Sequence, residues 1–296
     1  MGFFNSSLLR RLASYSKLVV LPHSVFALPF ALASFIIAFR RGPLVTPWGG
    51  AGVAVLLVIC AVVSARTAAM AFNRYLDRNI DSTNPRTVTR EIPSGNVTPK
   101  ESLLVVAFSS MAFFLSTWAL GWHCLLLAPF VYVWLLLYSF AKRFTSGAHV
   151  ILGTALALAP GGAWWVLRPS IEITPLLLMA GVLSWVAGFD IIYSCQDVVA
   201  DRKCGLYSIP SQVGIDSALM ISRTFHFLAF CLFLLTGLST GFEIYYFLGV
   251  VFVIGLPMFI QHRMVKPWDL SQVSASFFTA NGVLSILFLV LVALSS

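Results

Sequence analysis

Long apolar stretches recur along the whole of this 296-residue chain. A helix needs about 20 apolar residues to cross a bilayer, where only helices and closed barrels satisfy their backbone hydrogen bonds. With 59% hydrophobic and 10% charged residues, the chain also lies outside the range of soluble proteins. The third and fourth stretches are separated only by the segment 121–123, so eight helices remain an alternative. We predict an all-α integral membrane protein with nine transmembrane helices, at about 19–39, 50–71, 102–121, 122–140, 148–167, 174–194, 217–238, 243–261 and 272–295.

The basic residues are distributed unevenly between the two sides of this topology. If the N-terminus is cytoplasmic, Arg40, Arg41 and Arg168 fall on the outer side, whereas most of the 19 Lys and Arg residues fall on the inner side. Such a bias is typical of cytoplasmic loops. The formal net charge of +8 is therefore mainly a topology signal. We predict a multi-pass protein of a bacterial inner membrane, in contact with the lipid bilayer and with no nucleic-acid partner.

Two short acidic clusters share one spacing, in which polar residues recur at i, i+4 and i+8. On a helix this spacing places the side chains on one face. Crowded carboxylates repel one another, so several of them beside hydrocarbon indicate a cation between them. The clusters therefore predict a divalent-metal site that faces the cytoplasm. The residues are Asn73, Asp77 and Asp81 in the first cluster, and Tyr193, Asp197 and Asp201 in the second, with Asp190 one turn before Tyr193.

The clusters also reveal an internal repeat. They end the second and sixth predicted helices, and each precedes an Ile-Pro-Ser, at 92–94 and 209–211. We predict a single domain, 1–296, of two four-helix repeats around a central cavity, completed by the ninth helix. A parallel repeat of this kind places the functional site between its halves. Cytoplasmic loops at 74–101 and 202–216 are expected over the active site, and residues 1–18 are expected to form an amphipathic surface segment.

The chemistry of the clusters points to a diphosphate. Mg²⁺ prefers oxygen ligands and is held by one or two carboxylates while it bridges to substrate phosphates. Metal ions would neutralise a diphosphate, and the flanking Arg and Lys residues would bind its remaining oxygens. At the mouth of a bundle of apolar helices, such a site suits a molecule with an anionic head and an apolar tail. A polyprenyl diphosphate has that shape.

The residues around both clusters resemble a known family. The segment Asn73–Asp81, followed by Pro85-Arg86-Thr87 and by Arg90–Gly95, is similar to the first signature of the UbiA-type intramembrane aromatic prenyltransferases. The segment Asp190–Tyr193, with the two aspartates that follow it, is similar to their second signature. The resemblance covers essentially the whole chain. It implies Mg²⁺-dependent transfer of a polyprenyl group from its diphosphate to an aromatic acceptor, in ubiquinone or menaquinone biosynthesis.

The resemblance also implies roles for individual residues. Asp190 and Tyr193 would be catalytic residues beside the reacting carbon. Five residues would hold Mg²⁺, and through it the diphosphate: Asn73, Asp77, Asp81, Asp197 and Asp201. Basic residues near the clusters would bind the diphosphate: Arg78, Arg86, Arg90, Lys142, Arg143, Arg202 and Lys203. These basic residues have a plainer interpretation as topology signals or solvated loop residues. His149 is expected to be a packed or hydrogen-bonded histidine.

The identity of the acceptor is open. Asn73-Arg74 stands where many 4-hydroxybenzoate enzymes carry Asn-Asp, and Arg90-Glu91-Ile92-Pro93 stands where they carry Arg-Pro-Leu-Pro. The second form also resembles the branch that prenylates 1,4-dihydroxy-6-naphthoate in the futalosine-type menaquinone route. Arg66, seven residues before Asn73, is a candidate to bind an acceptor carboxylate; the alternative is an ion pair with Asp190. An arginine within the membrane indicates a function of some kind.

A cation-coupled transporter is the alternative from another class, since carboxylates within a membrane can bind a transported ion. Such carboxylates are expected near the centre of the bilayer. Here both clusters lie at cytoplasmic helix ends and precede basic segments. The position of the clusters therefore favours the enzyme.

Overall fold

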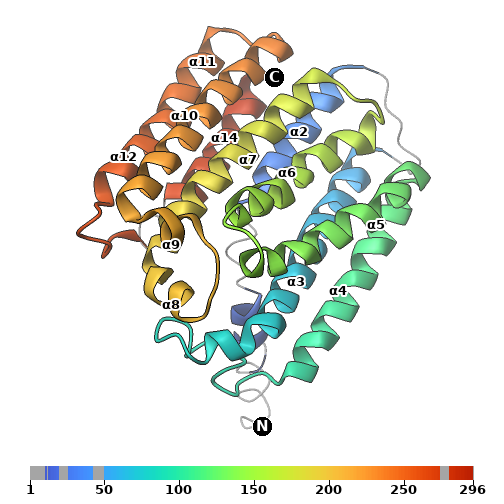
Figure 1. Ribbon diagram of the computed structural model, residues 1–296. Helices are drawn as coiled ribbons and strands as arrows, with labels where there is room; N and C mark the ends of the chain where they lie inside the picture. Colours follow the sequence, from blue (N-terminus) through green and yellow to red (C-terminus); the bar gives the residue numbers. More distant parts are fainter. Residues whose placement is uncertain (1–10, 12, 20–25, 43–49, 274–279, 296) are drawn as a thin grey trace, which may run out of the picture.

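The computed structural model of the chain is all-helical in the residues that it describes, which are 11, 13–19, 26–42, 50–273 and 280–295. In this part of the chain, seven helical segments are long and apolar enough to cross a membrane (Figure 1). Four of them are single helices: α3 (Ala51–Asp81), α4 (Pro99–Leu120), α6 (Ala148–Leu167) and α10 (Ile215–Thr240). Two others continue through a 3₁₀ turn: α5 (Trp122–Leu137) continues into η2 (Tyr138–Arg143), and α7 (Ile173–Ser194) continues through η3 (Cys195–Asp197) into α8 (Val198–Lys203). The last consists of α11 (Ile244–Val250), the π-helical η4 (Val251–Gly255) and α12 (Leu256–Met264).

Two shorter apolar helices lie where the first and ninth spans are predicted, α2 (Leu28–Arg40) and α14 (Asn281–Ser295). Residues 20–25 and 274–279, within or next to the two predicted spans, lie outside the described part of the chain. The all-helical membrane class is confirmed, whereas the count of nine stays a prediction. Most of the predicted N-terminal segment 1–18 also lies outside the described residues.

The junction between the third and fourth predicted spans is a clear break. α4 ends at Leu120 and α5 begins at Trp122, with Gly121 between them at a φ of 133°. This left-handed region is accessible to glycine at little cost, whereas other residues avoid it. At its other end, α4 begins with Pro99 and with a capping box between Thr98 and Glu101. The alternative of one long helix here is therefore wrong.

The helices pack around an aromatic core that joins the two ends of the chain to the middle. Phe30 of α2 lies 4.9 Å from Phe288 of α14 and 5.1 Å from Trp185 of α7, between ring centroids. Phe233 of α10 stacks on Phe30 at 5.6 Å. All four side chains are fully buried. This packing fixes α7 beside α2 and α14, so the second acidic cluster starts from a well-supported helix.

The outward faces of the helices are apolar. Figure 1 shows α4 and α5 together along one edge of the molecule. Large apolar side chains on these two helices point away from the protein and are more than half exposed: Phe108, Trp118, Leu126 and Phe130. In water such a surface would be costly, whereas in a bilayer it contacts lipid.

The two segments predicted as cytoplasmic loops are partly helical. α3 continues to Asp81, so the connection to α4, the α3–α4 loop, covers only 82–98 rather than 74–101. The helix extends because residues 53–84 include no glycine or proline to end it before Pro85. Within 202–216, Lys203 ends α8, and the short helix α9 (Ile209–Val213) begins with a Ser208 capping box and Pro210.

Candidate active site

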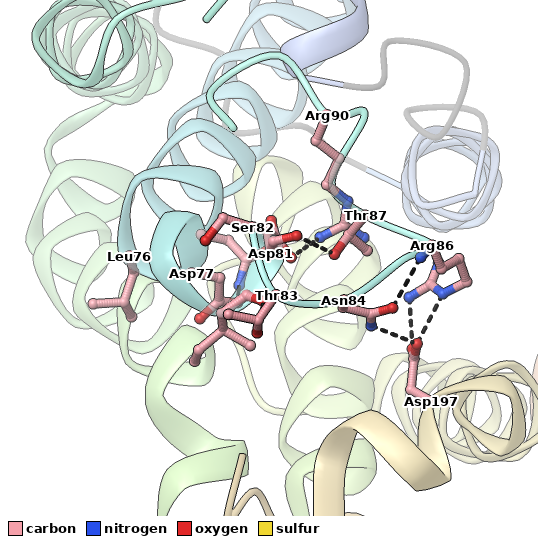
Figure 2. Close-up of polar contacts among 12 residues, drawn as sticks. Leu76, Asp77, Asp81, Ser82, Thr83, Asn84, Arg86, Thr87, Arg90 and Asp197 are labelled. Atoms are coloured by element: carbon pink, nitrogen blue, oxygen red, sulfur yellow. Dashed lines mark hydrogen bonds and ion pairs between the residues drawn. The ribbon is translucent and has the colours of Figure 1, made fainter. Parts of the chain in front are cut away.

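The first acidic cluster lies on one face of the last turns of α3, as its spacing predicts. Asn73 donates through Nδ2 to Asp77 Oδ2 at 3.1 Å, one helical turn away. Asp77 Oδ1 accepts a hydrogen bond from Arg143 Nη2 at 2.7 Å, and Asp81 Oδ1 accepts one from Arg90 Nη1 at 2.7 Å. Figure 2 shows Asp77 and Asp81 at the end of this helix. Each carboxylate of the first cluster is thus held by its own arginine.

The second acidic cluster does not lie on a single continuous α-helix, so this part of the prediction is wrong. Tyr193 belongs to α7, Asp197 ends the 3₁₀ turn η3, and Asp201 lies in α8. A 3₁₀ turn winds more tightly than an α-helix, and it is common at a helix end. Asp197 and Asp201 are nevertheless buried, as is Asp81 of the first cluster.

The α3–α4 loop connects the first half of the molecule to the second cluster. Arg86 donates to both carboxylate oxygens of Asp197, from Nε at 2.8 Å and from Nη2 at 2.5 Å. Arg86 Nη1 also donates to Tyr193 Oη at 2.8 Å, and Asn84 Nδ2 donates to Asp197 Oδ1 at 3.2 Å. Figure 2 shows Arg86 and Asn84 converging on Asp197. Burial alone would lower the pKa of Arg86, but the hydrogen bonds and charge of Asp197 raise it overall.

Adjacent residues of η2 reach the two different clusters. Arg143 pairs with Asp77 of the first cluster, whereas Lys142 Nζ lies 3.8 Å from Asp201 Oδ2 of the second. Consecutive Cα atoms are about 3.8 Å apart. Two neighbouring residues of one short segment thus connect the two clusters.

Three other predicted diphosphate ligands make different contacts. Arg78 donates to the backbone oxygen of Tyr75 at 2.7 Å and lies over its ring. Arg202 donates to the backbone oxygen of Ser211 at 2.9 Å. Lys203 is exposed, and the described residues offer its side chain neither a hydrogen bond nor an ion pair. The structure thus brings Arg86, Arg90, Lys142 and Arg143 to the carboxylates and leaves these three apart from them.

Asp190 is held by a buried histidine rather than by Arg66. His149 Nδ1 lies 2.6 Å from Asp190 Oδ2. The backbone N–H of Ile209 donates to His149 Nε2 at 3.2 Å, so the ring proton must be on Nδ1, from which it is donated to Asp190. His149 is hydrogen-bonded, as expected, and it fixes the orientation of a predicted catalytic carboxylate. The sequence holds no signal for this pairing, since the two residues are 41 positions apart.

The donor set suits Mg²⁺. Asp81 Oδ2 and Asp201 Oδ2, one in each cluster, are buried oxygens without a hydrogen-bond partner in the described part of the chain. Anionic oxygens of this kind are hard ligands of the type that Mg²⁺ prefers. Among the described residues no three His, Cys, Asp or Glu side chains converge on one metal position, and basic residues pair with the carboxylates. Metal binding would therefore exchange some of these ion pairs.

An apolar cavity of about 350 Å³ lies among α3, α4, α5 and α6. Ligand pockets in proteins typically measure roughly 300–1,000 Å³. Arg66 is the one charged side chain among the described residues that line this cavity, and Tyr138 lines it as well. Arg66 Nε is buried without a hydrogen-bond partner in the described residues. The cavity can thus hold an apolar group and one anionic group.

Comparison with known proteins identifies the family to which this chain belongs. The model of the UbiA prenyltransferase family matches residues 27–289. The chain belongs to the UbiA prenyltransferase family. A 4-hydroxybenzoate octaprenyltransferase from Shewanella denitrificans is 28% identical over 238 residues, covering 80% of each chain. The apo structure of a UbiA homologue from Aeropyrum pernix is 28% identical, with a TM-score of 0.77, and the match covers 92% of this chain and 96% of that one.

A third relative extends the comparison at the level of the fold. A UbiA homologue from Archaeoglobus fulgidus, bound to GPP and Mg²⁺, has a TM-score of 0.74 and 17% identity. The match covers 95% of this chain and 99% of that one. This UbiA-family chain is a prenyltransferase with several membrane-spanning helices. Membership of the family decides against the transporter interpretation.

Proposed function

We propose that this UbiA-family chain transfers a polyprenyl group from polyprenyl diphosphate to an aromatic acceptor of quinone biosynthesis, with Mg²⁺ as cofactor. The observation that supports this most directly is the contact of Lys142 and Arg143 with carboxylates of the two different clusters. Two carboxylate sets and their basic partners then surround one position for a diphosphate. The neighbouring apolar cavity supplies a place for organic groups.

Each part of the site has a separate task in this mechanism. Bound Mg²⁺ would be held by Asn73 and the four motif aspartates, and it makes diphosphate a better leaving group. Arg86, Arg90, Lys142 and Arg143 exchange carboxylate oxygens for phosphate oxygens when the substrate binds. The bond between carbon and diphosphate oxygen breaks, the acceptor ring bonds to that carbon, and the ring loses a proton.

Asp190 and Tyr193 stabilise the allylic cation that develops at the reacting carbon. His149 restricts Asp190 to one orientation by its 2.6 Å hydrogen bond. The apolar walls of the cavity exclude water, which would otherwise capture the cation. The residues therefore divide into a polar end that binds the diphosphate and an apolar part that protects the reaction.

The acceptor is an aromatic carboxylate in this proposal. Arg66 presents its charge to an apolar cavity, and it has no ion pair among the described residues. A guanidinium binds a carboxylate through two parallel hydrogen bonds. 4-Hydroxybenzoate is favoured by the name of the Shewanella denitrificans relative. 1,4-Dihydroxy-6-naphthoate is the second candidate, favoured by Arg90-Glu91-Ile92-Pro93, and Asn73-Arg74 departs from the usual 4-hydroxybenzoate pattern.

We place the site at the cytoplasmic face of a bacterial inner membrane, in a fold of nine transmembrane helices. The distribution of basic residues supports this orientation, because Arg86, Arg90, Lys142 and Arg143 gather at the same end of the helix bundle. At the other end, in the part of the chain that the structure describes, Arg41 and Arg168 form ion pairs with Glu172.

A panel of acceptors tests the proposed function. The protein in membranes or nanodiscs is given polyprenyl diphosphate, Mg²⁺ and one acceptor at a time, and the product is identified by mass. Prenylation of 4-hydroxybenzoate or of 1,4-dihydroxy-6-naphthoate is expected, with loss on chelation of Mg²⁺. Absence of a prenylated product with every aromatic acid, under conditions in which the protein is folded, would overturn the proposal.

A further inference from the structure

Arg74 lies on the site side of α3, at the end of the first acidic cluster that is nearer the apolar cavity. It precedes Asp81 by seven residues, which is about two helical turns, so the two side chains start from the same face of α3, about 10 Å apart along its axis. Arg66 lies about two turns further from Asp81. Arg74 therefore occupies the level at which the metal site passes into the cavity.

The surroundings of Arg74 lack an obvious acidic partner. Its side chain is only partly exposed, and its Nε is buried without a hydrogen-bond acceptor in the described residues. Asp81 lies within electrostatic range of Arg74, but the described residues include no carboxylate within ion-pair distance of it. Removal of an arginine from water is costly unless an anion compensates its charge. An anionic ligand would supply this compensation.

Arg74 differs from its basic neighbours in that its Nε has no hydrogen-bond partner among the described residues. Arg86, Arg90 and Arg143 each pair with an aspartate, and Arg78 contacts Tyr75. Those side chains must break a contact before they can bind a substrate. Arg74 Nε has no such contact to break.

We propose that Arg74 binds the diphosphate of the prenyl donor from the membrane-facing side of the metal site. This inference rests on the proposed function and assigns a residue that the motif spacing did not identify. Arg90, Asp81, Tyr138 and Tyr193 lie within electrostatic range of Arg74, so its charge acts where the metal site meets the cavity that Tyr138 lines. Arg66, in contrast, lines the apolar cavity. The planar guanidinium of Arg74 offers paired N–H donors that match two phosphate oxygens.

The fixed charge also alters how much metal the site needs. A guanidinium at this level supplies part of the positive charge that neutralises a diphosphate. Without it, more of this charge has to come from bound Mg²⁺. Loss of Arg74 should therefore weaken diphosphate binding and raise the Mg²⁺ concentration at which binding is half-maximal.

Direct binding measurements on the full-length protein in nanodiscs test this role. Geranyl diphosphate is titrated by calorimetry at fixed Mg²⁺ into the wild type, Arg74→Gln and Arg74→Lys. We expect Arg74→Gln to raise Kd about tenfold to a hundredfold, and Arg74→Lys to raise it less, because a lysine keeps the charge but loses the paired donors. Arg223→Gln, which removes a charge from an exposed position of α10, is the matched control and should leave Kd within about twofold.

Three outcomes are distinguished. If the wild type itself does not bind geranyl diphosphate in the presence of Mg²⁺, both the proposed function and this inference fail. If the wild type binds it and both Arg74 variants bind it with unchanged Kd and Mg²⁺ dependence, the role of Arg74 is wrong and the proposed function stands. Thermal melting monitors folding. If Arg74→Gln does not fold, Arg74→Lys alone decides: a raised Kd supports the role of Arg74, and an unchanged Kd refutes it.

Discussion

The two acidic clusters have the same spacing in the sequence but differ in backbone structure. The first lies on an unbroken helix, whereas the second crosses from α7 through the turn at Cys195–Asp197 into α8. Their basic partners also differ in origin. Arg90, nine residues away, pairs with Asp81, whereas Arg86, more than a hundred residues away, pairs with Asp197. The first cluster thus combines one local partner, Arg90, with one distant partner, Arg143, whereas the arginine that pairs with the second cluster is distant.

The comparison also shows that the basic partners come from one part of the molecule. Arg86, Arg90, Lys142 and Arg143 all precede α6, yet they contact aspartates of both clusters. The second cluster therefore depends on the first half of the chain for its charge compensation. Disturbance of the α3–α4 loop should affect both halves of the site.

The largest effect is expected from removal of a motif carboxylate. Asp77→Asn and Asp197→Asn should each lower kcat/KM by more than about a thousandfold, because in the proposed mechanism either change removes a charge that holds the metal and the diphosphate. The measurement is the rate of prenyl transfer at saturating Mg²⁺. Glu172→Gln, which changes a carboxylate at the opposite end of the molecule, is the control and should retain activity. Full activity in either aspartate variant would show that the two clusters are not equally required.

A smaller effect is expected when the contact between the halves is removed. Arg86→Met leaves Asp197 buried without its two strongest hydrogen bonds, so it should lower kcat/KM about a hundredfold and the free energy of unfolding by about 1–3 kcal/mol. Thermal melting and steady-state kinetics measure the two quantities. Arg90→Met should lower activity as well. If Arg86→Met had no effect on either quantity, the dependence of the second cluster on the first half would be refuted.

A still smaller and more selective effect is expected in the cavity. Arg66→Met should raise KM for the aromatic acceptor about thirtyfold through loss of hydrogen bonds to its carboxylate, with the KM for prenyl diphosphate nearly unchanged. Kinetics with each substrate varied in turn separate the two constants. Equal changes in KM for the acceptor and in KM for prenyl diphosphate would show that the cavity does not bind the acceptor selectively.

The smallest effect concerns the orientation of Asp190. His149→Ala should lower kcat about tenfold with little change in KM for prenyl diphosphate, because the carboxylate remains but its position is less restricted. His149→Asn, which can still donate a hydrogen bond, should recover part of the loss. If the asparagine variant were no better than the alanine variant while both remained folded, His149 would not act through orientation of Asp190.

The sequence predicted the parts of the structure that depend on local pattern. Apolar length identified the membrane helices, and the i, i+4 spacing placed Asn73, Asp77 and Asp81 on one face of α3. Gly121 marked a real boundary between two helices. These features depend on interactions within a few residues, so a local pattern is enough to predict them.

The sequence could not predict contacts that depend on how the helices pack. Arg86 pairs with Asp197, and His149 pairs with Asp190. Both contacts join residues that are far apart in the chain. The turn at Cys195–Asp197 keeps a helix-like spacing while it changes the winding, so periodicity does not reveal it. Similarly, the sequence marks Arg74 only as a departure from the usual Asn-Asp pattern, and its surroundings in the structure distinguish its role from that of Arg78.

The most direct test of the central claim, that both clusters hold one diphosphate, is the stoichiometry of binding. Geranyl diphosphate is titrated by calorimetry into the purified protein at saturating Mg²⁺, in the wild type, Asp77→Asn and Asp197→Asn. The account predicts one diphosphate per chain in the wild type and loss of this binding in both variants. Binding at the wild-type affinity and stoichiometry in either variant would contradict it.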